Sequence, residues 1–552
     1  MKKLAKFLLV IICIPFACVQ NSNENTPLKR NGNKPKLVVG IVIDQFRPDY
    51  LTRYAEHFSE DGFKRLVADG FYNKNTHFNY IPTYTGPGHA SVYTGTTPAT
   101  HGIIGNDWYD RELKKTVYCA GDTAVQTVGS ESRQGLMSPH RMLSSTITDE
   151  LSFATNFRSK VVGVAIKDRG SILPAGHNPT GAFWYDSSTG DFISSSYYDI
   201  AALPQWVQDF NARKLSDKYL DSAWTLSMEA EKYTQSTADD KAYETVVKGK
   251  EKAVFPYDLK ELREKNGNFK LLPSTPFGNT ISTDLAIAAI EGEQMGQDSI
   301  TDFLALSYSS TDYIGHGFGP RSVEVQDTYL KLDQDIARLL NYLDETVGKD
   351  EYLIFVTSDH GCAEVPSYMT SKKMPAGYYS SKNYKESIQT ALTEKYGNGD
   401  WLEYYSNEQF FLDHDLIAKK KIKLDEIRQF VVDQSLKLEG VAKAYSASDM
   451  QQIEFTEGIA SALQMGYHFK RSGDVLLVLE PGWFHQTSIA TTHGSGYAYD
   501  SHVPLIWFGA GIKSGESYKR QSIDDIAVTL SFLLETKLPN GATGEPVLEV
   551  LE

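Results

Sequence analysis

The chain has 552 residues, 23% of them charged, and a formal net charge of −15. This length allows a large core, and a hydrophobic content of 41% with 32 Tyr and 26 Phe argues against a disordered chain. The acidic balance argues against duplex nucleic acid as a specific partner. Cys119 and Cys362 are the only cysteines beyond the first eighteen residues. This excludes a framework of several disulfides, and whether the two form a single disulfide bond with each other stays open.

The first residues predict export. Three Lys precede an apolar run over residues 7–17, which is too short to span a bilayer and is typical of a secretory signal peptide, here 1–17. Cys18 follows as in a bacterial lipoprotein signal, although Pro15 stands where a Leu-like residue is usual, so lipid anchoring and ordinary cleavage both fit. Cleavage removes three Lys and no acid, which takes the charge to −18. We expect a polar tether over 18–36 and a periplasmic, cell-surface (outer-membrane lipoprotein) or secreted protein.

Short apolar runs alternate with helical periodicities along the rest of the chain. The runs, which are typical of strands buried on both faces, cover residues 37–43, 161–166, 303–308, 352–357, 475–479 and 505–508. Helical periods cover residues 142–153, 281–295, 325–343 and 526–534. The alternation predicts an α/β sandwich, with helices on both faces of a largely parallel sheet.

We expect one catalytic domain over 37–552. Two segments, at about 119–276 and 368–470, are richer in Tyr, Lys, Ser and Asn and poorer in long strand patterns. They are interpreted as cap insertions over the carboxyl edge of the sheet.

Carboxylates and imidazoles follow several of the expected strands. The candidate metal ligands are Asp44, Asp312, His316, Asp359, His360 and His493. Taken singly, each is more typical of a turn or a surface position. In open parallel sheets, however, the carboxyl ends of the strands form a common site, so the set predicts a shared metal centre. The D-x-x-x-H spacing of Asp312 and His316 places both on one turn of helix.

A Gly-Pro-Gly sequence directly follows Thr85. Residues 83–91 read Thr-Tyr-Thr-Gly-Pro-Gly-His-Ala-Ser. Gly-Pro-Gly before small residues predicts a turn that enters a helix, where free backbone N–H groups such as that of Gly86 favour an anion. Thr85 at this junction fits an N-cap, the commoner role. Alternatively, its hydroxyl could bind a metal, ionise and act as a nucleophile.

These motifs, together with Asn106 in H-G-I-I-G-N and Lys167-Asp-Arg169, resemble the alkaline phosphatase superfamily over essentially the whole mature chain. The likeness is greatest to its phosphate-irrepressible secreted bacterial members, which use a Thr nucleophile. The resemblance implies two Zn²⁺ and a substrate-binding group of Asn106, Lys167 and Arg169 at the phosphoryl oxygens. One zinc would be held by Asp312, His316 and His493, and the other by Asp44, Asp359 and His360 with Thr85.

The expected reaction is hydrolysis of small phosphate monoesters by two in-line displacements, through a phosphothreonine at Thr85. Mixed Asp and His ligands favour zinc, with manganese or iron as alternatives. One rival is a phosphodiesterase or nucleotide pyrophosphatase of the same superfamily, although Lys167 and Arg169 suit a monoester dianion better. Another is a non-catalytic surface protein that binds phosphate ligands, which the complete set of ligands and the nucleophile argue against.

Overall fold

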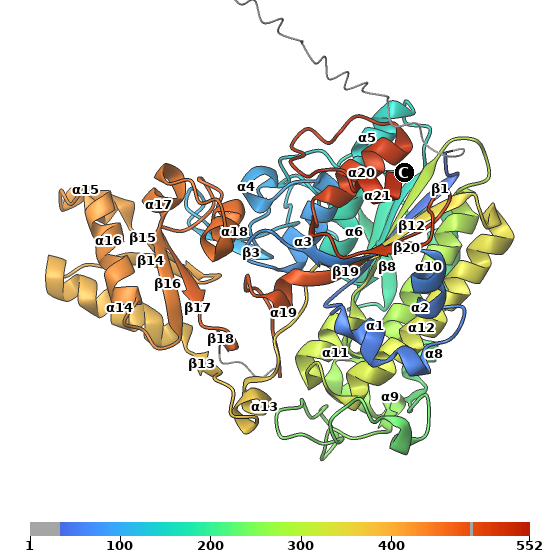
Figure 1. Ribbon diagram of the computed structural model, residues 1–552, viewed down its shortest axis with the longest axis horizontal. Coiled ribbons are helices and arrows are strands. Elements are labelled where there is room, and N and C mark those ends of the chain that lie inside the picture. Colours follow the sequence, from blue (N-terminus) through green and yellow to red (C-terminus); the bar gives the residue numbers. More distant parts are fainter. Residues whose placement is uncertain (1–33, 486–489, 552) are drawn as a thin grey trace, which may run out of the picture.

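The computed structural model describes residues 34–485 and 490–551 (Figure 1). The predicted signal peptide, Cys18 and most of the expected tether lie outside the described residues. Among the helices of the described ranges, none combines the length and the apolar character that crossing a bilayer requires.

An eleven-stranded sheet forms the centre of the main body, in the order β20-β2-β19-β12-β1-β11-β6-β7-β8-β5 with β21 beside β2. The five strands from β12 to β7 are parallel, and antiparallel pairs join β19 to β12 and β2, and β8 to β7 and β5. The predicted, largely parallel α/β sheet is therefore confirmed. The strand bounds are β1 (Leu37–Ile43), β2 (Phe71–His77), β5 (Thr127–Val128), β6 (Val161–Ala165), β7 (Gly181–Asp186), β8 (Asp191–Ser195), β11 (Asp302–Tyr308), β12 (Tyr352–Thr357), β19 (His502–Gly509), β20 (Gly515–Ser517) and β21 (Gln521–Ser522).

Two hydrophobic cores lie on opposite faces of this sheet. Successive side chains of a strand point to opposite faces, and in β1 Val39 and Ile41 join one core whereas Val38 and Val42 join the other. The first core packs under α2 (Phe63–Asp69), α10 (Phe277–Glu293) and α12 (Val323–Leu343), and the second under α3 (Thr85–Thr94), α5 (Ile147–Ala154) and α20 (Asp525–Leu534). Figure 1 shows these helices on the two sides of the sheet.

The helix α12 follows directly from its sequence. Apolar residues at positions 325, 329, 332, 336, 339 and 343 recur every three or four positions, and all six are buried. Ser322 precedes the helix, and its hydroxyl accepts a hydrogen bond of 3.1 Å from the backbone N–H of Val325, which caps the first turn.

A second lobe contains a four-stranded antiparallel sheet in the order β14-β15-β17-β16. It forms the orange part at the left of Figure 1. The run at 475–479 belongs here, as β17, and not to the main sheet. The lobe elements are α14 (Ser381–Tyr396), β14 (Leu402–Ser406), β15 (Gln409–Leu412), α15 (His414–Lys419), α16 (Leu424–Ser435), β16 (Val441–Ser446), α17 (Ala447–Gln452), α18 (Gly458–Gly466) and β17 (Val475–Leu479).

The segment 119–276, expected as a cap insertion, instead contributes β5 to β8 to the main sheet. The physical reason is that β6 and β7 are buried along their whole length and continue the parallel pairing from β11. The later part of the segment packs against the first core through α7 (Gln205–Ala212), α8 (Leu215–Leu220), β9 (Ala223–Trp224), β10 (Tyr257–Asp258) and α9 (Leu259–Leu262).

Candidate functional site

Three carboxylates meet where neighbouring parallel strands end. Asp44 directly follows β1, and Asp359 lies two residues after β12. Asp312 lies in the first turn of α11 (Ser310–Phe318), just after β11. Because β1 pairs with both β11 and β12, these strand ends are adjacent. All three side chains are buried, so their charges lie in a low-dielectric region.

One group of possible ligands consists of Asp312, His316 and His493. The Nε2 atoms of His316 and His493 lie 3.1 and 3.8 Å from Asp312 Oδ1. Each histidine donates from Nδ1 to a backbone carbonyl at 2.7 Å, that of Thr491 for His316 and that of Thr83 for His493. These bonds orient both rings with Nε2 toward the carboxylate, as in the histidine ligands of metal sites.

A second group consists of Asp44, Asp312 and His360. The Nε2 atom of His360 lies 3.4 Å from Asp44 Oδ1 and 3.6 Å from Asp359 Oδ2. Both of these carboxylate oxygens are buried and have no hydrogen-bond partner. The rings of His360 and His493 stack with centroids 3.4 Å apart, so the two groups are contiguous.

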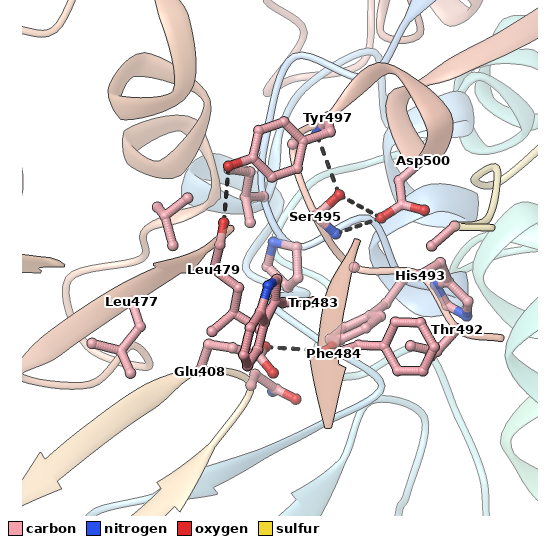
Figure 2. A pocket seen from close by; sticks show the side chains of 18 of the residues that line it. Glu408, Leu477, Leu479, Trp483, Phe484, Thr492, His493, Ser495, Tyr497 and Asp500 are labelled. Atoms are coloured by element: carbon pink, nitrogen blue, oxygen red, sulfur yellow. Dashed lines mark hydrogen bonds between the residues drawn. The ribbon is translucent and has the colours of Figure 1, made fainter. Parts of the chain in front are cut away.

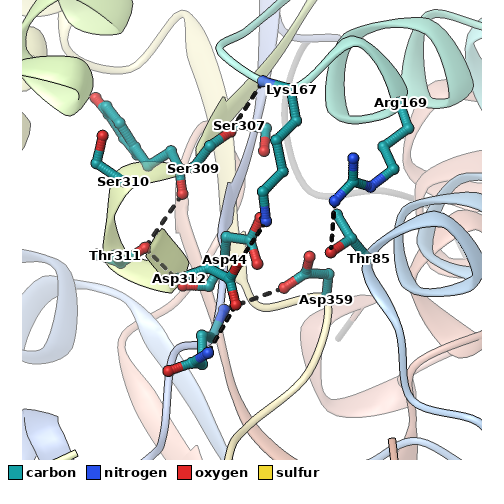
Figure 3. Close-up of polar contacts among 12 residues, drawn as sticks. Asp44, Thr85, Lys167, Arg169, Ser307, Ser309, Ser310, Thr311, Asp312 and Asp359 are labelled. Atoms are coloured by element: carbon teal, nitrogen blue, oxygen red, sulfur yellow. Dashed lines mark hydrogen bonds and ion pairs between the residues drawn. The ribbon is translucent and has the colours of Figure 1, made fainter. Parts of the chain in front are cut away.

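Lys167 lies between two of the carboxylates. Its Nζ is 2.5 Å from Asp44 Oδ2 and 2.6 Å from Asp312 Oδ2, as Figure 3 shows. Burial lowers the pKa of Lys167, but the two carboxylates offset this effect and raise its pKa above the ordinary value. The ammonium group is therefore charged and directed toward the carboxylates.

The pKa values of the three acids are shifted in different directions. Burial, followed by the charge of Asp312, raises the pKa of Asp44 to about 6, and burial with Asp44 raises the pKa of Asp359 as well. Burial also opposes the ionisation of Asp312, but His316 and Lys167 hold its pKa well below the usual range. Such perturbed carboxyl groups, close together at a strand edge, are typical of functional sites.

Thr85 is the first residue of α3, with Tyr84 as the N-cap. Its buried Oγ1 lies 3.4 Å from His360 Nε2. It also accepts a hydrogen bond of 3.5 Å from Arg169 Nη2 (Figure 3). The helix can approach this closely because of Gly88, where an added Cβ would lie 2.3 Å from the carbonyl oxygen of Asp359. The hydroxyl is thus at a helix N-terminus, where the helix dipole favours negative charge.

Further polar groups surround the threonine. The backbone N–H of Gly86 donates to Asn106 Oδ1 at 2.7 Å. Arg169 Nη1 donates to the hydroxyl of Tyr118 at 3.0 Å, while its Nε is buried without a partner. The hydroxyl of Tyr118 in turn bonds to Asp168. These contacts fix the guanidinium beside Thr85.

Like Tyr118, two further residues of this site, Gln45 and His89, have no role in the sequence analysis. Gln45 donates from Nε2 to Asp312 Oδ1 at 2.6 Å, and its backbone N–H reaches Asp359 Oδ1 at 3.2 Å. His89 contacts the carbonyl of Thr85 and the hydroxyl of Ser307, both at 2.9 Å. Only the adjacency of Gln45 to Asp44, and the presence of His89 in the Gly-Pro-Gly-His motif, could have indicated them.

A pocket adjoins this site and extends toward the second lobe (Figure 2). Its open space is about 880 Å³, including the mouth. Aromatic and aliphatic side chains line it, among them Trp483, Phe484 and Leu479, and His493 forms part of its wall. Glu408 from the lobe also lines it and accepts a hydrogen bond from Tyr84 at 3.4 Å. Tyr84, the residue before Thr85, therefore lies in the wall of this largely apolar pocket.

Cys119 and Cys362 are both buried and both free. These two cysteines therefore do not form the internal disulfide bond that the sequence leaves open.

Residues 38–502 match the family described as type I phosphodiesterase / nucleotide pyrophosphatase, and the chain belongs to this family. It is 45% identical to alkaline phosphatase PafA of Elizabethkingia meningoseptica, over 94% of this chain and 95% of that protein. It is 43% identical to alkaline phosphatase PhoV of Synechococcus elongatus, over 98% and 99%. A protein of Myroides odoratus named calcium-transporting ATPase is 44% identical, over 94% and 95%.

A crystal structure of alkaline phosphatase PafA matches with a TM-score of 0.90 at 44% identity, and the match covers 95% of this chain and all of that one. The predicted resemblance to the alkaline phosphatase superfamily and the predicted fold class are therefore confirmed.

Proposed function

We propose that this protein is an alkaline phosphatase, a metal-dependent hydrolase of phosphate monoesters that forms a phosphothreonine at Thr85. The observation that carries the proposal is the position of the Thr85 hydroxyl at the start of α3, within 3.4 to 3.5 Å of His360 and Arg169. The names of the relatives at 43% and 45% identity support a phosphoric monoester hydrolase.

The residues fit a pair of metal ions. Buried carboxylate oxygens without partners, Asp44 Oδ1 and Asp359 Oδ2, are costly unless a cation binds them. Mixed Asp and His donors suit zinc. We propose Asp312, His316 and His493 for one ion, and Asp44, Asp359 and His360 with Thr85 for the other. When bound, the two ions would supply Lewis acidity that favours an ionised threonine and stabilises a departing oxygen.

The chain's own groups then account for the chemistry. The Thr85 hydroxyl loses its proton to water and Oγ1 attacks phosphorus in line, the bond from phosphorus to the ester oxygen breaks, and the departing alkoxide takes up a proton from water to leave as the alcohol. Water attacks the phosphothreonine from the same side that the alcohol left, the bond to Oγ1 breaks, and inorganic phosphate departs. Arg169, Asn106, Lys167 and the N–H of Gly86 are proposed to bind the non-bridging oxygens, because a phosphoryl group needs several donors.

Phosphodiester cleavage is a second candidate, because the description of the family includes it. A diester carries one negative charge and a monoester two, so the cationic pair Lys167 and Arg169 favours the monoester. Comparison of kcat/KM for a nitrophenyl monoester, its diester and ATP tests this order. A preference for the diester would reverse it. ATP is included because one relative carries the name of an ATPase.

We infer that the pocket beside His493 receives the organic part of the ester. Its apolar walls suit an aromatic or extended group, while the charged groups near Thr85 suit the phosphate. The substrates would accordingly be small phosphate monoesters. The export signal predicted for residues 1–17 would place the enzyme outside the cytoplasm, either free or anchored through Cys18.

Replacement of the nucleophile tests the proposal. Thr85→Ala should abolish turnover while zinc content stays near two per chain, and Thr85→Ser should restore activity. Turnover by the alanine variant at the rate of the unaltered enzyme would remove Thr85 from the mechanism. Phosphate release that persists unchanged in a chelated sample would remove the metals, and no release under any condition would favour a purely binding protein.

A further inference from the structure

A second cluster of acids lies apart from the proposed active site. Asp239, Glu244 and Glu324 each offer one oxygen, and these oxygens lie within 4.8 Å of one another. Glu324 is in the first turn of α12, while Asp239 and Glu244 belong to the loop that precedes β10. Glu324 and Glu244 are buried, and Asp239 is partly exposed.

The carboxylates of this cluster are incompletely partnered. Glu324 Oε1 accepts from the hydroxyl of Tyr257 at 2.6 Å, Glu244 Oε2 from the N–H of Lys241 at 2.6 Å, and Asp239 Oδ2 from the N–H of Phe255 at 3.2 Å. The second oxygen of each acid is buried without any partner: Asp239 Oδ1, Glu244 Oε1 and Glu324 Oε2.

Lys250 and Lys241 only partly offset the raised pKa values of Asp239 and Glu244, and neither forms an ion pair with these acids in the described part of the chain. Among residues 34–485 and 490–551, no ion pair joins any of the three acids to Lys, Arg or His. The ammonium of Lys250 is nearby, but it lies over the ring of Tyr257 and donates to the carbonyl of Pro256 at 2.7 Å. Burial and the neighbouring acids raise the pKa of Glu244 to about 7, which reflects the cost of holding these charges together.

We propose that Asp239, Glu244 and Glu324 bind a hard divalent cation, Ca²⁺. Carboxylate oxygens without nitrogen or sulfur donors are the ligands that Ca²⁺ prefers, and it accepts waters to complete its six to eight ligands. Each acid has one oxygen without a hydrogen-bond partner that is available to it. This site is independent of the proposed zinc ligands and uses none of them.

The location gives the ion a structural task. The loop that carries Glu244 is joined to the end of α11, because the N–H of Thr245 donates to the carbonyl of Gly317 at 2.8 Å. That helix carries Asp312 and His316. A cation held between the loop and the start of α12 would therefore brace the connection between α11 and α12, next to two proposed zinc ligands.

The test uses the full mature protein, loaded with zinc and kept in a zinc-buffered solution. Tb³⁺, which replaces Ca²⁺ at oxygen sites, should show luminescence on excitation of Trp and Tyr, because Tyr257 bonds to Glu324 and stacks on Trp224 with centroids 5.2 Å apart. Added Ca²⁺ should displace it. Tm should rise with Ca²⁺ by about 2 °C at 100 times Kd for a chain of this length.

Matched variants identify the ligands. Glu244→Gln and Glu324→Gln remove one charge each without changing shape, and both should abolish the Ca²⁺-dependent rise in Tm and the displaceable luminescence. Asp240→Asn is the control, since Asp240 is in the same loop but pairs with Lys252 at 2.7 Å, and it should keep both responses.

Two results would overturn the proposal. One is that the unaltered protein shows neither displaceable luminescence nor a rise in Tm with Ca²⁺. The other is that both Gln variants keep the displaceable luminescence and the Ca²⁺-dependent rise in Tm of the unaltered protein. Zinc content and phosphatase activity are separate measurements, so failure here leaves the proposed function untouched.

Discussion

Removal of Arg169 gives a quantitative test of how the site binds phosphate. The guanidinium is held beside Thr85 by Tyr118, and its buried Nε has no partner within the protein. In Arg169→Ala the transition state loses a preorganised, charge-assisted donor, which typically costs about 3–4 kcal/mol, or 10²- to 10³-fold in rate. The electrostatic attraction scales with substrate charge. A diester, with half the charge, should therefore lose about 10- to 30-fold.

The assay is kcat/KM for a nitrophenyl monoester and the corresponding diester, on zinc-loaded enzyme of verified Tm. Tyr118→Phe keeps the arginine but removes one hydrogen bond of about 1 kcal/mol, so it should lose about fivefold. Arg158→Ala, at an exposed arginine, is the control and should leave both rates unchanged. A loss below tenfold on the monoester, or equal losses on both substrates, would refute the assigned role of Arg169.

Three further predictions follow from other parts of the structure. Asp474→Asn should destabilise the protein by about 3 kcal/mol, because its buried carboxylate binds two arginines; denaturant unfolding checks this, and equal behaviour of the exposed control Asp415→Asn would contradict it. Zinc uptake by the metal-free protein should weaken as pH falls toward about 6 and below, because the pKa values of Asp44, Asp359 and His316 are all raised and protons then compete with the metal for these ligands. Isothermal titration at several pH values measures this, and uptake that does not change with pH would contradict it. Trp483→Ala should raise KM for an aromatic monoester more than for a small alkyl phosphate, and equal changes would disprove the assignment of the pocket.

The main sheet could be predicted largely from apolar patterning. The run at 352–357 is β12 residue for residue, and the periodicity from 325 to 343 is the greater part of α12. Such patterns report burial, and burial on both faces is what a central parallel strand requires. They do not report which sheet a strand joins. The run at 475–479 has the same apolar character, yet it forms β17 in the second lobe.

The candidate site was predictable where a residue's place in a strand decides its position. Asp44 and Asp359 follow strands that pair side by side, so strand ends alone bring them together. Contacts set by side-chain reach were not predictable. Lys167 was expected at the phosphoryl oxygens, and its ion pairs with Asp44 and Asp312 depend on the three-dimensional path of its side chain. The contacts of Gln45 likewise require the packing of α11 against the end of β1.

The most direct test of the proposed mechanism is to trap its covalent intermediate. Enzyme mixed with excess monoester is quenched in acid during turnover, digested and analysed by mass spectrometry. The mechanism predicts one phosphoryl group on the peptide that contains Thr85, assigned to that residue by fragmentation, and none in Thr85→Ala. Rapid turnover without a phosphorylated peptide at any pH, or a phosphoryl group on a different side chain, would contradict it.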